Sequence, residues 1–286
     1  MERLGPWPAR LTWLVLPLVA GPAFADALDD ASRPVQVVSG LGLWGGWAAV
    51  LVATLVPATV TLTALRVAAP AAVAAAVAAT VAGGPSTADA VALGGTLVAA
   101  LAAFWPVTGE VFVDGSAYGD ERRLPLRVPG PLVAGPLELV WALVVAGVAT
   151  GPLLLAARQW VLGAVAVAVG GAAAWWGLRV LHGLSRRWVV LVPAGLVVHD
   201  PLALVDPVLV PRAALRSLGP APADSDALDL TRGAFGLALE LRFADPVSLL
   251  VVRGRGESDA VTAEAVLVTP TRPGALLTEA RARRLA

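Results

Sequence analysis

The sequence predicts a membrane protein in two parts: a bundle of about six membrane-spanning helices in residues 1–184, and a mainly-β domain closed by one helix in residues 185–286. Of the 286 residues, 57% are hydrophobic and only 15% are charged, whereas a soluble protein carries about 25% charged residues. The mean hydropathy is +0.76. Long apolar runs fill the first part, and short runs separated by turn residues fill the second.

Six apolar runs approach the roughly 20 residues that a helix needs to cross a bilayer. The last two are separated only by a short stretch containing Arg158, and the third is mostly alanine and contains Pro70. The predicted spans are residues 9–25, 40–57, 63–83, 89–107, 132–156 and 160–181.

The first run allows two interpretations. Arg3 and Arg10 precede the apolar stretch Leu11–Ala20, and Ala23-Phe24-Ala25 follows it, an order typical of a signal peptide with its cleavage site. The alternative is an uncleaved first helix, which keeps the number of helices even. Sequencing the N-terminus of the mature protein distinguishes the two, since cleavage would leave Asp26 as the first residue.

Arginine positions predict the orientation in the membrane, because basic residues near helix ends favour the cytoplasmic side. With the N-terminus inside, only Arg33 and Arg158 lie outside. The cytoplasmic side then holds Arg3, Arg10, Arg66, Arg122, Arg123, Arg127, Arg179, Arg186 and Arg187. We therefore expect a multi-pass protein of the plasma membrane with both termini in the cytoplasm.

After Ser185 the apolar runs have the length of strands. The chain alternates apolar and polar residues over 237–243, the pattern of a half-buried strand. Further strands are expected at Trp188–Val192, Leu196–His199, Val208–Val210, Val247–Val252 and Val266–Val268. We expect a loop over 219–227, turns at Asp245-Pro246 and Arg253–Gly256, and a helix from Pro273 through Arg284.

The segment Arg-Trp-Val-Val-Leu-Val-Pro-Ala-Gly-Leu-Val-Val-His-Asp, residues 187–200, resembles the opening hairpin of bacterial PH-like domains attached to membrane proteins. Val268–Pro273, leading into a helix, is similar to their closing segment. The chain as a whole resembles uncharacterised multi-pass membrane proteins of high-GC Gram-positive bacteria. The resemblance implies a PH-like C-terminal domain and supplies no activity.

A glycine pattern in the second predicted helix matches a dinucleotide-binding fingerprint in form only. Gly40, Gly42 and Gly45 have the G-x-G-x-x-G spacing, but they open a membrane helix and residues 59–65 contain no acid. Small residues in membrane helices let backbones approach closely. We therefore expect close helix packing through Gly42 and Gly46, and no cofactor.

Residues with metal-binding or catalytic chemistry are few. Cysteine is absent, which excludes thiolate chemistry. The two histidines, His182 and His199, lie far apart in the sequence, and both are expected to be structural polar residues with their hydrogen bonds satisfied. No nucleophile–base pair or metal set is visible, so we expect no enzyme and no metal. The zero net charge also argues against nucleic acid as a partner.

The segment Gly109–Gly130 concentrates charges between two apolar runs. One interpretation is a solvated cytoplasmic loop whose opposite charges pair. The other is a docking or ligand-gating element near the membrane surface, in which Arg122 and Arg123 take part in docking.

Two groups of residues are candidates for interaction with lipid or ligand. Glu138, about six residues into the fifth predicted helix, is a candidate intramembrane polar site and could pair with Arg66. Where the last helix meets the second domain, a basic and aromatic collar could contact anionic lipid headgroups or simply anchor the chain. Its members are Arg179, Arg186, Arg187 and Trp188.

These features favour a non-enzymatic membrane protein. In this hypothesis the helices anchor a cytoplasmic PH-like module that contacts the inner leaflet or a membrane or cytoplasmic protein. The alternative is a transporter or channel subunit with a polar site near Glu138. An intramembrane enzyme is the third possibility, and no residue constellation supports it.

Overall fold

The fold, a computed structural model, describes residues 5–254 and 256–285. Arg3 and Arg255, which figure in the predicted orientation and in a predicted turn, lie outside the described residues. The chain divides into two compact units. The helical unit comprises Met1–Phe112 and Glu138–His182, and the sheet unit comprises Val113–Leu137 and Gly183–Ala286.

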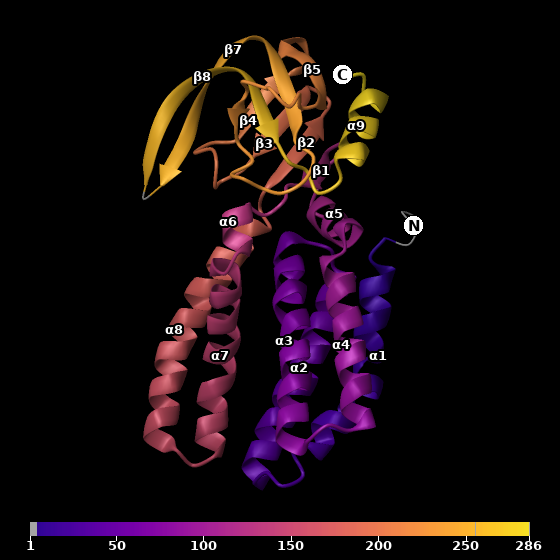
Figure 1. The fold of residues 1–286 in the computed structure, drawn as a ribbon, viewed down its shortest axis with the longest axis vertical. Coiled ribbons are helices and arrows are strands. Elements are labelled where there is room, and N and C mark those ends of the chain that lie inside the picture. Colours follow the sequence, from indigo (N-terminus) through magenta and orange to yellow (C-terminus); the bar gives the residue numbers. More distant parts are fainter. Residues whose placement is uncertain (1–4, 255, 286) are drawn as a thin grey trace. The chain divides into compact units, whose positions relative to one another are not determined.

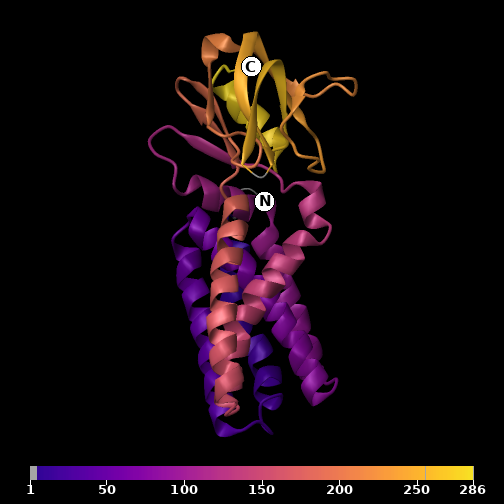
Figure 2. The ribbon, with the colours of Figure 1, turned by 90° about the vertical axis from the view of Figure 1, so that its left-hand side faces the viewer.

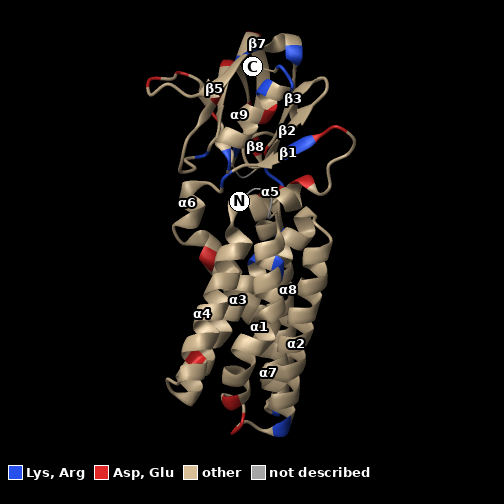
Figure 3. Ribbon diagram, turned by 90° about the vertical axis from the view of Figure 1, so that its right-hand side faces the viewer, with Lys and Arg blue, Asp and Glu red and all other residues tan. Residues whose placement is uncertain are grey.

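Among the residues that the structure describes, six helices are long and apolar enough to cross a membrane, which confirms the predicted fold class (Figure 1). Only 11–33% of the residues in their apolar windows are buried, so most of these side chains suit hydrocarbon surroundings and not water. Charged residues are sparse along the helices (Figure 3). The six are α1 (Trp7–Asp26), α2 (Arg33–Leu55), α3 (Thr59–Gly83), α4 (Thr87–Phe104), α7 (Pro136–Ala156) and α8 (Trp160–Leu184).

The start of α7 differs from the predicted span of 132–156. A short helix, α6 (Gly130–Val133), comes first, and Gly135 then has a φ of +138°. Only glycine adopts this conformation readily, so the chain turns there and α7 begins at Pro136. Glu138 consequently lies in the first turn of α7, and not six residues inside a helix as the apolar run had indicated.

Small side chains bring α1, α3 and α4 together. Ala20 and Ala23 of α1, Ala76 of α3 and Ala92 of α4 form one buried cluster. Alanine lets helix backbones approach closely where no hydrophobic effect drives association. The first apolar run is thus an integral part of the helical unit. A further helix, α5 (Pro106–Asp114), follows α4.

Close packing through glycine occurs between α7 and α8. A Cβ on Gly170 would lie 2.7 Å from the carbonyl oxygen of Gly147, and side chains at Gly151 or Gly163 would also meet the facing helix. The prediction of close packing through Gly42 and Gly46 is wrong, because nothing lies within 4 Å of a Cβ placed at either residue. The α7–α8 hairpin therefore makes the small-residue contact that had been expected at α2.

Two hydrogen bonds join this hairpin to α3. His182 Nδ1 lies 3.0 Å from the Thr63 hydroxyl, and the Trp141 indole donates to the Val67 carbonyl oxygen at 3.0 Å. Hydrogen bonds between helices stabilise membrane bundles, so His182 has the structural role that was predicted.

The first sheet of the second unit is antiparallel, in the order β1-β2-β3-β4. Its strands are β1 (Arg122–Pro125), β2 (Trp188–Val192), β3 (Gly195–His199) and β4 (Val208–Pro211). Strand β1 comes from the charged segment Gly109–Gly130, so α7 and α8 are inserted between two paired strands. The sheet unit therefore includes Val113–Leu137, which the predicted boundary at residue 185 had assigned to the helices.

The second sheet has the order β5-β7-β8-β6. Its strands are β5 (Leu215–Pro220), β6 (Leu228–Asp229), β7 (Leu239–Gly254) and β8 (Glu257–Val268). The predicted turn at Asp245-Pro246 is wrong, because β7 continues through it with a shift of register between Arg242 and Val247. Proline lacks an N–H and is tolerated in a strand at such an irregularity. The predicted loop over 219–227 also begins too early, since Gly219 and Pro220 belong to β5.

The core of the sheet unit lies between the two sheets and α9 (Pro273–Ala282), the helix predicted from Pro273 (Figure 2). Leu191 and Leu196 of the first sheet, Leu239 and Leu241 of the second, and Leu276 of α9 are all fully buried in it.

Candidate functional site

The outer face of the first sheet carries a shallow cavity of about 230 Å³. Successive residues of a strand point to opposite faces. Val189 and Leu191 of β2 point into the core, so Trp188, Val190 and Val192 point outward. The cavity is lined by Glu121, Arg123, Trp188, Val190, Val192, Val197, His199 and Pro207.

Trp188 is the centre of this site. Its strand register places it opposite His199, and the two rings stack with centroids 4.8 Å apart. The guanidinium of Arg123, from β1, lies 5.5 Å from the Trp188 ring centroid, within the range of a cation–π contact. Three neighbouring strands thus bring a cation, an indole and an imidazole together.

Two nitrogen atoms of the site lack a protein partner. Arg123 Nε and His199 Nε2 are buried and form no hydrogen bond. A buried polar atom left unsatisfied costs about 1–3 kcal/mol. A ligand that hydrogen-bonds to these atoms, after small side-chain rotations expose them, would recover this cost. His199 therefore differs from the prediction that both histidines have satisfied hydrogen bonds.

The charges around the cavity favour an anion. Arg123 donates from Nη2 to the Glu121 carboxylate at 3.0 Å, and this hydrogen bond lowers the pKa of Glu121. Burial lowers the pKa of His199, the positive charges of Arg186 and Arg123 lower it further, and Asp200 opposes them. With His199 neutral, Arg123 and Glu121 balance within the cavity lining and Asp200 is balanced by Arg187, so the exposed Arg186 leaves one positive charge beside the cavity.

The charged segment before β1 pairs its own charges. Arg122 forms an ion pair with Asp114, and the Arg123 backbone N–H donates to the same carboxylate at 2.8 Å. This agrees with the interpretation that opposite charges pair in the segment. It also fixes β1 so that Arg123 reaches the cavity, whereas Arg122 does not line it.

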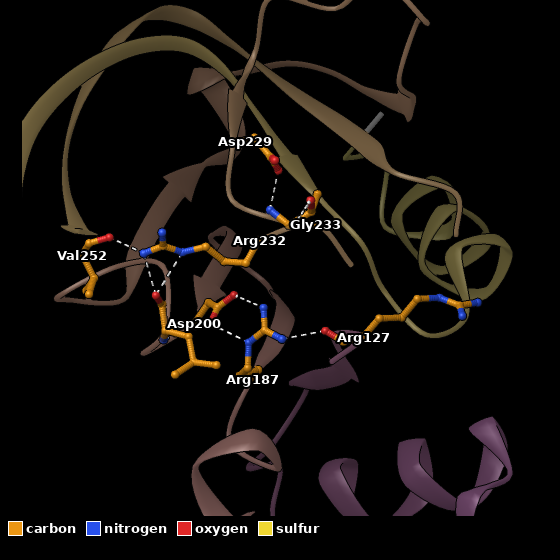
Figure 4. Close-up of polar contacts among 9 residues, drawn as sticks. Arg127, Arg187, Asp200, Asp229, Arg232, Gly233 and Val252 are labelled. Atoms are coloured by element: carbon orange, nitrogen blue, oxygen red, sulfur yellow. Dashed lines mark hydrogen bonds and ion pairs between the residues drawn. The ribbon is translucent and has the colours of Figure 1, made fainter. Parts of the chain in front are cut away.

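The predicted collar separates into residues with different surroundings. Arg187 is fully buried and pairs with Asp200, while its Nη1 donates to the Arg127 carbonyl oxygen at 2.6 Å (Figure 4). Arg179 lies 4.6 Å from the ring centroid of Trp175 in the helical unit. Trp188 lines the cavity, and Arg186 is exposed and influences His199.

The predicted intramembrane pair is not brought together. Glu138 is exposed, and among the described residues no hydrogen bond or ion pair connects it to Arg66. The Arg66 guanidinium lies instead 5.6 Å from the Phe104 ring centroid, and its buried Nε has no hydrogen-bond partner.

His199 is the site residue that the sequence interpretation missed. The tight turn at Pro193-Ala194 pairs Val192 with Gly195 and so aligns Trp188 with His199, a register that the hairpin pattern alone could have predicted. In the part of the chain that the structure describes, no three His, Asp or Glu side chains are placed to hold a metal ion together. Comparison with protein-family models, with curated proteins and with solved structures finds no match to this chain.

Proposed function

We propose that this membrane protein anchors a PH-like interaction module at the cytoplasmic surface of the plasma membrane, and that the module binds anionic lipid headgroups. The observation that carries the proposal is the cavity around Trp188, in which Arg123 Nε and His199 Nε2 are buried without partners. Two four-stranded sheets closed by α9 support the PH-like assignment.

The size and donors of the cavity indicate the class of ligand. Its 230 Å³ is smaller than the roughly 300–1,000 Å³ of pockets that enclose drug-sized ligands. A guanidinium donates hydrogen bonds and accepts none, and a neutral imidazole donates from one of its two nitrogens. A phosphate group meets these conditions, since it is small, anionic and rich in acceptor oxygens.

Chain length keeps the site near the membrane. Trp188 follows Leu184, the last residue of α8, by four residues, and four residues span at most about 14 Å. Val190, Val192 and Val197 surround the indole with apolar surface. Tryptophan with apolar and basic neighbours is typical of the membrane interface, which favours a lipid headgroup over an acidic protein.

The anchoring role is supported by the path of the chain. It enters the sheet unit at the end of α5, leaves it at the start of α7 and returns at the end of α8. Three covalent connections, at Val113, Leu137 and Gly183, thus join the two units. A module attached in this way is confined to the membrane surface without any bound partner.

The test measures lipid binding by the full-length protein in a neutral detergent. Native mass spectrometry counts bound phosphatidylglycerol and phosphatidylcholine for the wild type, for Arg123→Gln with Arg186→Gln, and for Arg253→Gln. We expect preference for the anionic lipid, weakened about fivefold per arginine removed from the site, since each arginine near an anionic surface contributes about 1 kcal/mol.

Arg253→Gln is the matched control, because Arg253 is an exposed arginine of the same unit, paired with Asp259 and away from the cavity. Equal losses per arginine removed in the two variants would mean that overall charge, and not the site, binds the lipid. Equal binding of both lipids would overturn the proposal. If the module binds an acidic protein instead, the wild type will show no lipid preference.

A further inference from the structure

A second, larger cavity of about 600 Å³ lies within the helical unit. Its volume is typical of pockets that enclose a whole ligand. Helices α1, α2 and α3 form most of its wall, and α4 contributes one residue, Thr96. The lining includes Trp13, Gly42, Trp44, Gly46, Trp47 and Thr96.

The cavity exists because α2 packs on the other helices at one end only. Its buried residues are Val50 and Thr54, both near its C-terminal end. Over residues 33–49 no side chain of α2 is buried. Gly42 and Gly46 line the cavity, yet a Cβ at either would meet nothing within 4 Å. These glycines therefore leave space open, in contrast to the tight glycine contacts between α7 and α8.

The contact between α1 and α2 is held by a reciprocal pair of hydrogen bonds. The Trp13 indole donates to the Trp47 carbonyl oxygen at 3.0 Å, and the Trp47 indole donates to the Trp13 carbonyl oxygen at 2.9 Å. Arg10 Nε adds a bond to the Thr54 carbonyl oxygen at 2.9 Å. Specific hydrogen bonds thus hold α1 and α2 at a fixed position along the cavity wall. The space between the two helices is therefore defined by these contacts.

The lining presents almost no polar group that is free to hydrogen-bond to a ligand. The indole N–H groups of Trp13 and Trp47 already donate to each other's backbone carbonyl oxygens, and the Thr96 hydroxyl donates to the Ala92 carbonyl oxygen at 2.9 Å. Trp44 is 59% exposed. Apolar cavities do not hold water, and an empty cavity reduces stability in proportion to its volume. Among molecules surrounding membrane helices, a hydrocarbon chain suits this lining.

We propose that this cavity binds a hydrocarbon chain of a membrane lipid, which enters between α1 and the unburied part of α2. The glycines of α2 provide the width, and the pair Trp13–Trp47 limits how far the chain penetrates. The proposal concerns a site in the helical unit and does not depend on headgroup binding by the sheet unit.

The test is photolabelling of the full-length protein in nanodiscs with a phosphatidylcholine that carries a diazirine on its acyl chain. Labelled positions are mapped by proteolysis and mass spectrometry. We expect several-fold more label on the cavity segments 13–28 and 40–47 than on Val161 and Val169, which are exposed residues of α8.

Gly42→Leu with Gly46→Leu fills the cavity, and we expect it to abolish the excess label. Gly45→Leu is the matched control, because Gly45 belongs to the same helix, has equally open surroundings, and does not line the cavity. A polyprenyl phosphate bearing a benzophenone, used in a parallel arm, distinguishes an isoprenoid chain from an acyl chain.

Equal labelling of the cavity segments and of α8 in the wild type would overturn the proposal, as would excess label that persists in the filled variant. If the filled variant does not fold, the ratio of cavity label to α8 label in the wild type still decides. The Gly42→Leu and Gly46→Leu substitutions do not alter Arg123. Loss of the excess label in this variant is therefore independent of the headgroup experiment.

Discussion

Arg187 and Asp200 form a two-point ion pair inside the sheet unit, with Arg187 Nε 2.7 Å from Asp200 Oδ1 and Nη2 2.6 Å from Oδ2. Their side chains are only 2% and 0% exposed. The remaining guanidinium nitrogen bonds to the carbonyl oxygen of Arg127, and Asp200 also accepts from the Leu202 backbone N–H. One ion pair therefore joins the segment after α8, the end of β3 and the segment after β1 (Figure 4).

Removing one partner of this pair should destabilise the sheet unit. Asp200→Asn leaves the Arg187 charge buried without a counter-ion, a loss of about 3–5 kcal/mol in the free energy of unfolding. Hydrogen exchange of the full-length protein in detergent should show reduced protection of β1, β2 and β3. Protection of α1–α4 should not change.

An exposed ion pair of the same unit provides the control. Arg253 and Asp259 are 54% and 59% exposed, and exposed pairs contribute roughly 0–1 kcal/mol. Asp259→Asn should therefore leave protection nearly unchanged. If the two asparagine variants behave alike, the buried pair is not what holds the three segments together.

The division between helices and strands could be predicted from the sequence, because the length of an apolar run distinguishes a bilayer crossing from a strand. Strand β1 could not be predicted in this way. Arg122-Arg123-Leu124-Pro125 has no alternating pattern, and its partner strand begins at Trp188, beyond both helices of the hairpin. The cavity around Trp188 was missed for the same reason, since Arg123 reaches it only when β1 pairs with β2.

The role of each glycine could not be predicted, because glycine permits both close packing and open space. Gly147 and Gly42 occur in similar apolar surroundings in the sequence. One meets a facing helix and the other borders a cavity. Whether a glycine packs closely or borders open space depends on the path of the neighbouring helix. That path cannot be read from the pattern of a single sequence.

The glycine contact between α7 and α8 predicts that a large side chain is tolerated at Gly171 and not at the adjacent Gly170. Gly170→Leu should separate the hairpin, because its side chain would meet the backbone of Gly147, whereas Gly171→Leu should be tolerated, because nothing lies within 4 Å of its Cβ. Thermal unfolding in detergent should show a lower Tm for Gly170→Leu only. Equal Tm values would contradict the packing described for this hairpin.

His199 should make stability depend on pH. Its pKa is lowered in the folded protein by burial and by Arg186 and Arg123, against the opposing charge of Asp200, while Glu121 also faces the cavity. Below the unfolded pKa of about 6.5, the unfolded chain therefore binds a proton that the folded chain does not. Stability should fall as the pH drops below this value.

The measurement compares Tm at several pH values from 7.5 to 5 for the wild type and His199→Gln, with His182 present in both. The variant should lose less stability on acidification, because glutamine does not titrate. A bound anion should raise the pKa of His199, so phosphatidylglycerol should reduce the loss in the wild type. Identical pH profiles for the two proteins would show that His199 does not titrate as its surroundings imply.

The carboxylate of Glu121 should compete with an anionic ligand for Arg123. Glu121 accepts from Arg123 Nη2 at 3.0 Å and lines the same cavity. Glu121→Gln keeps a hydrogen-bond acceptor and removes the negative charge, so phosphatidylglycerol binding should strengthen about fivefold, the effect of about 1 kcal/mol per charge near the lipid. Glu257→Gln, an exposed acid at the start of β8, should have no such effect. Weaker binding by Glu121→Gln would instead mean that Glu121 holds Arg123 in the orientation that the ligand needs.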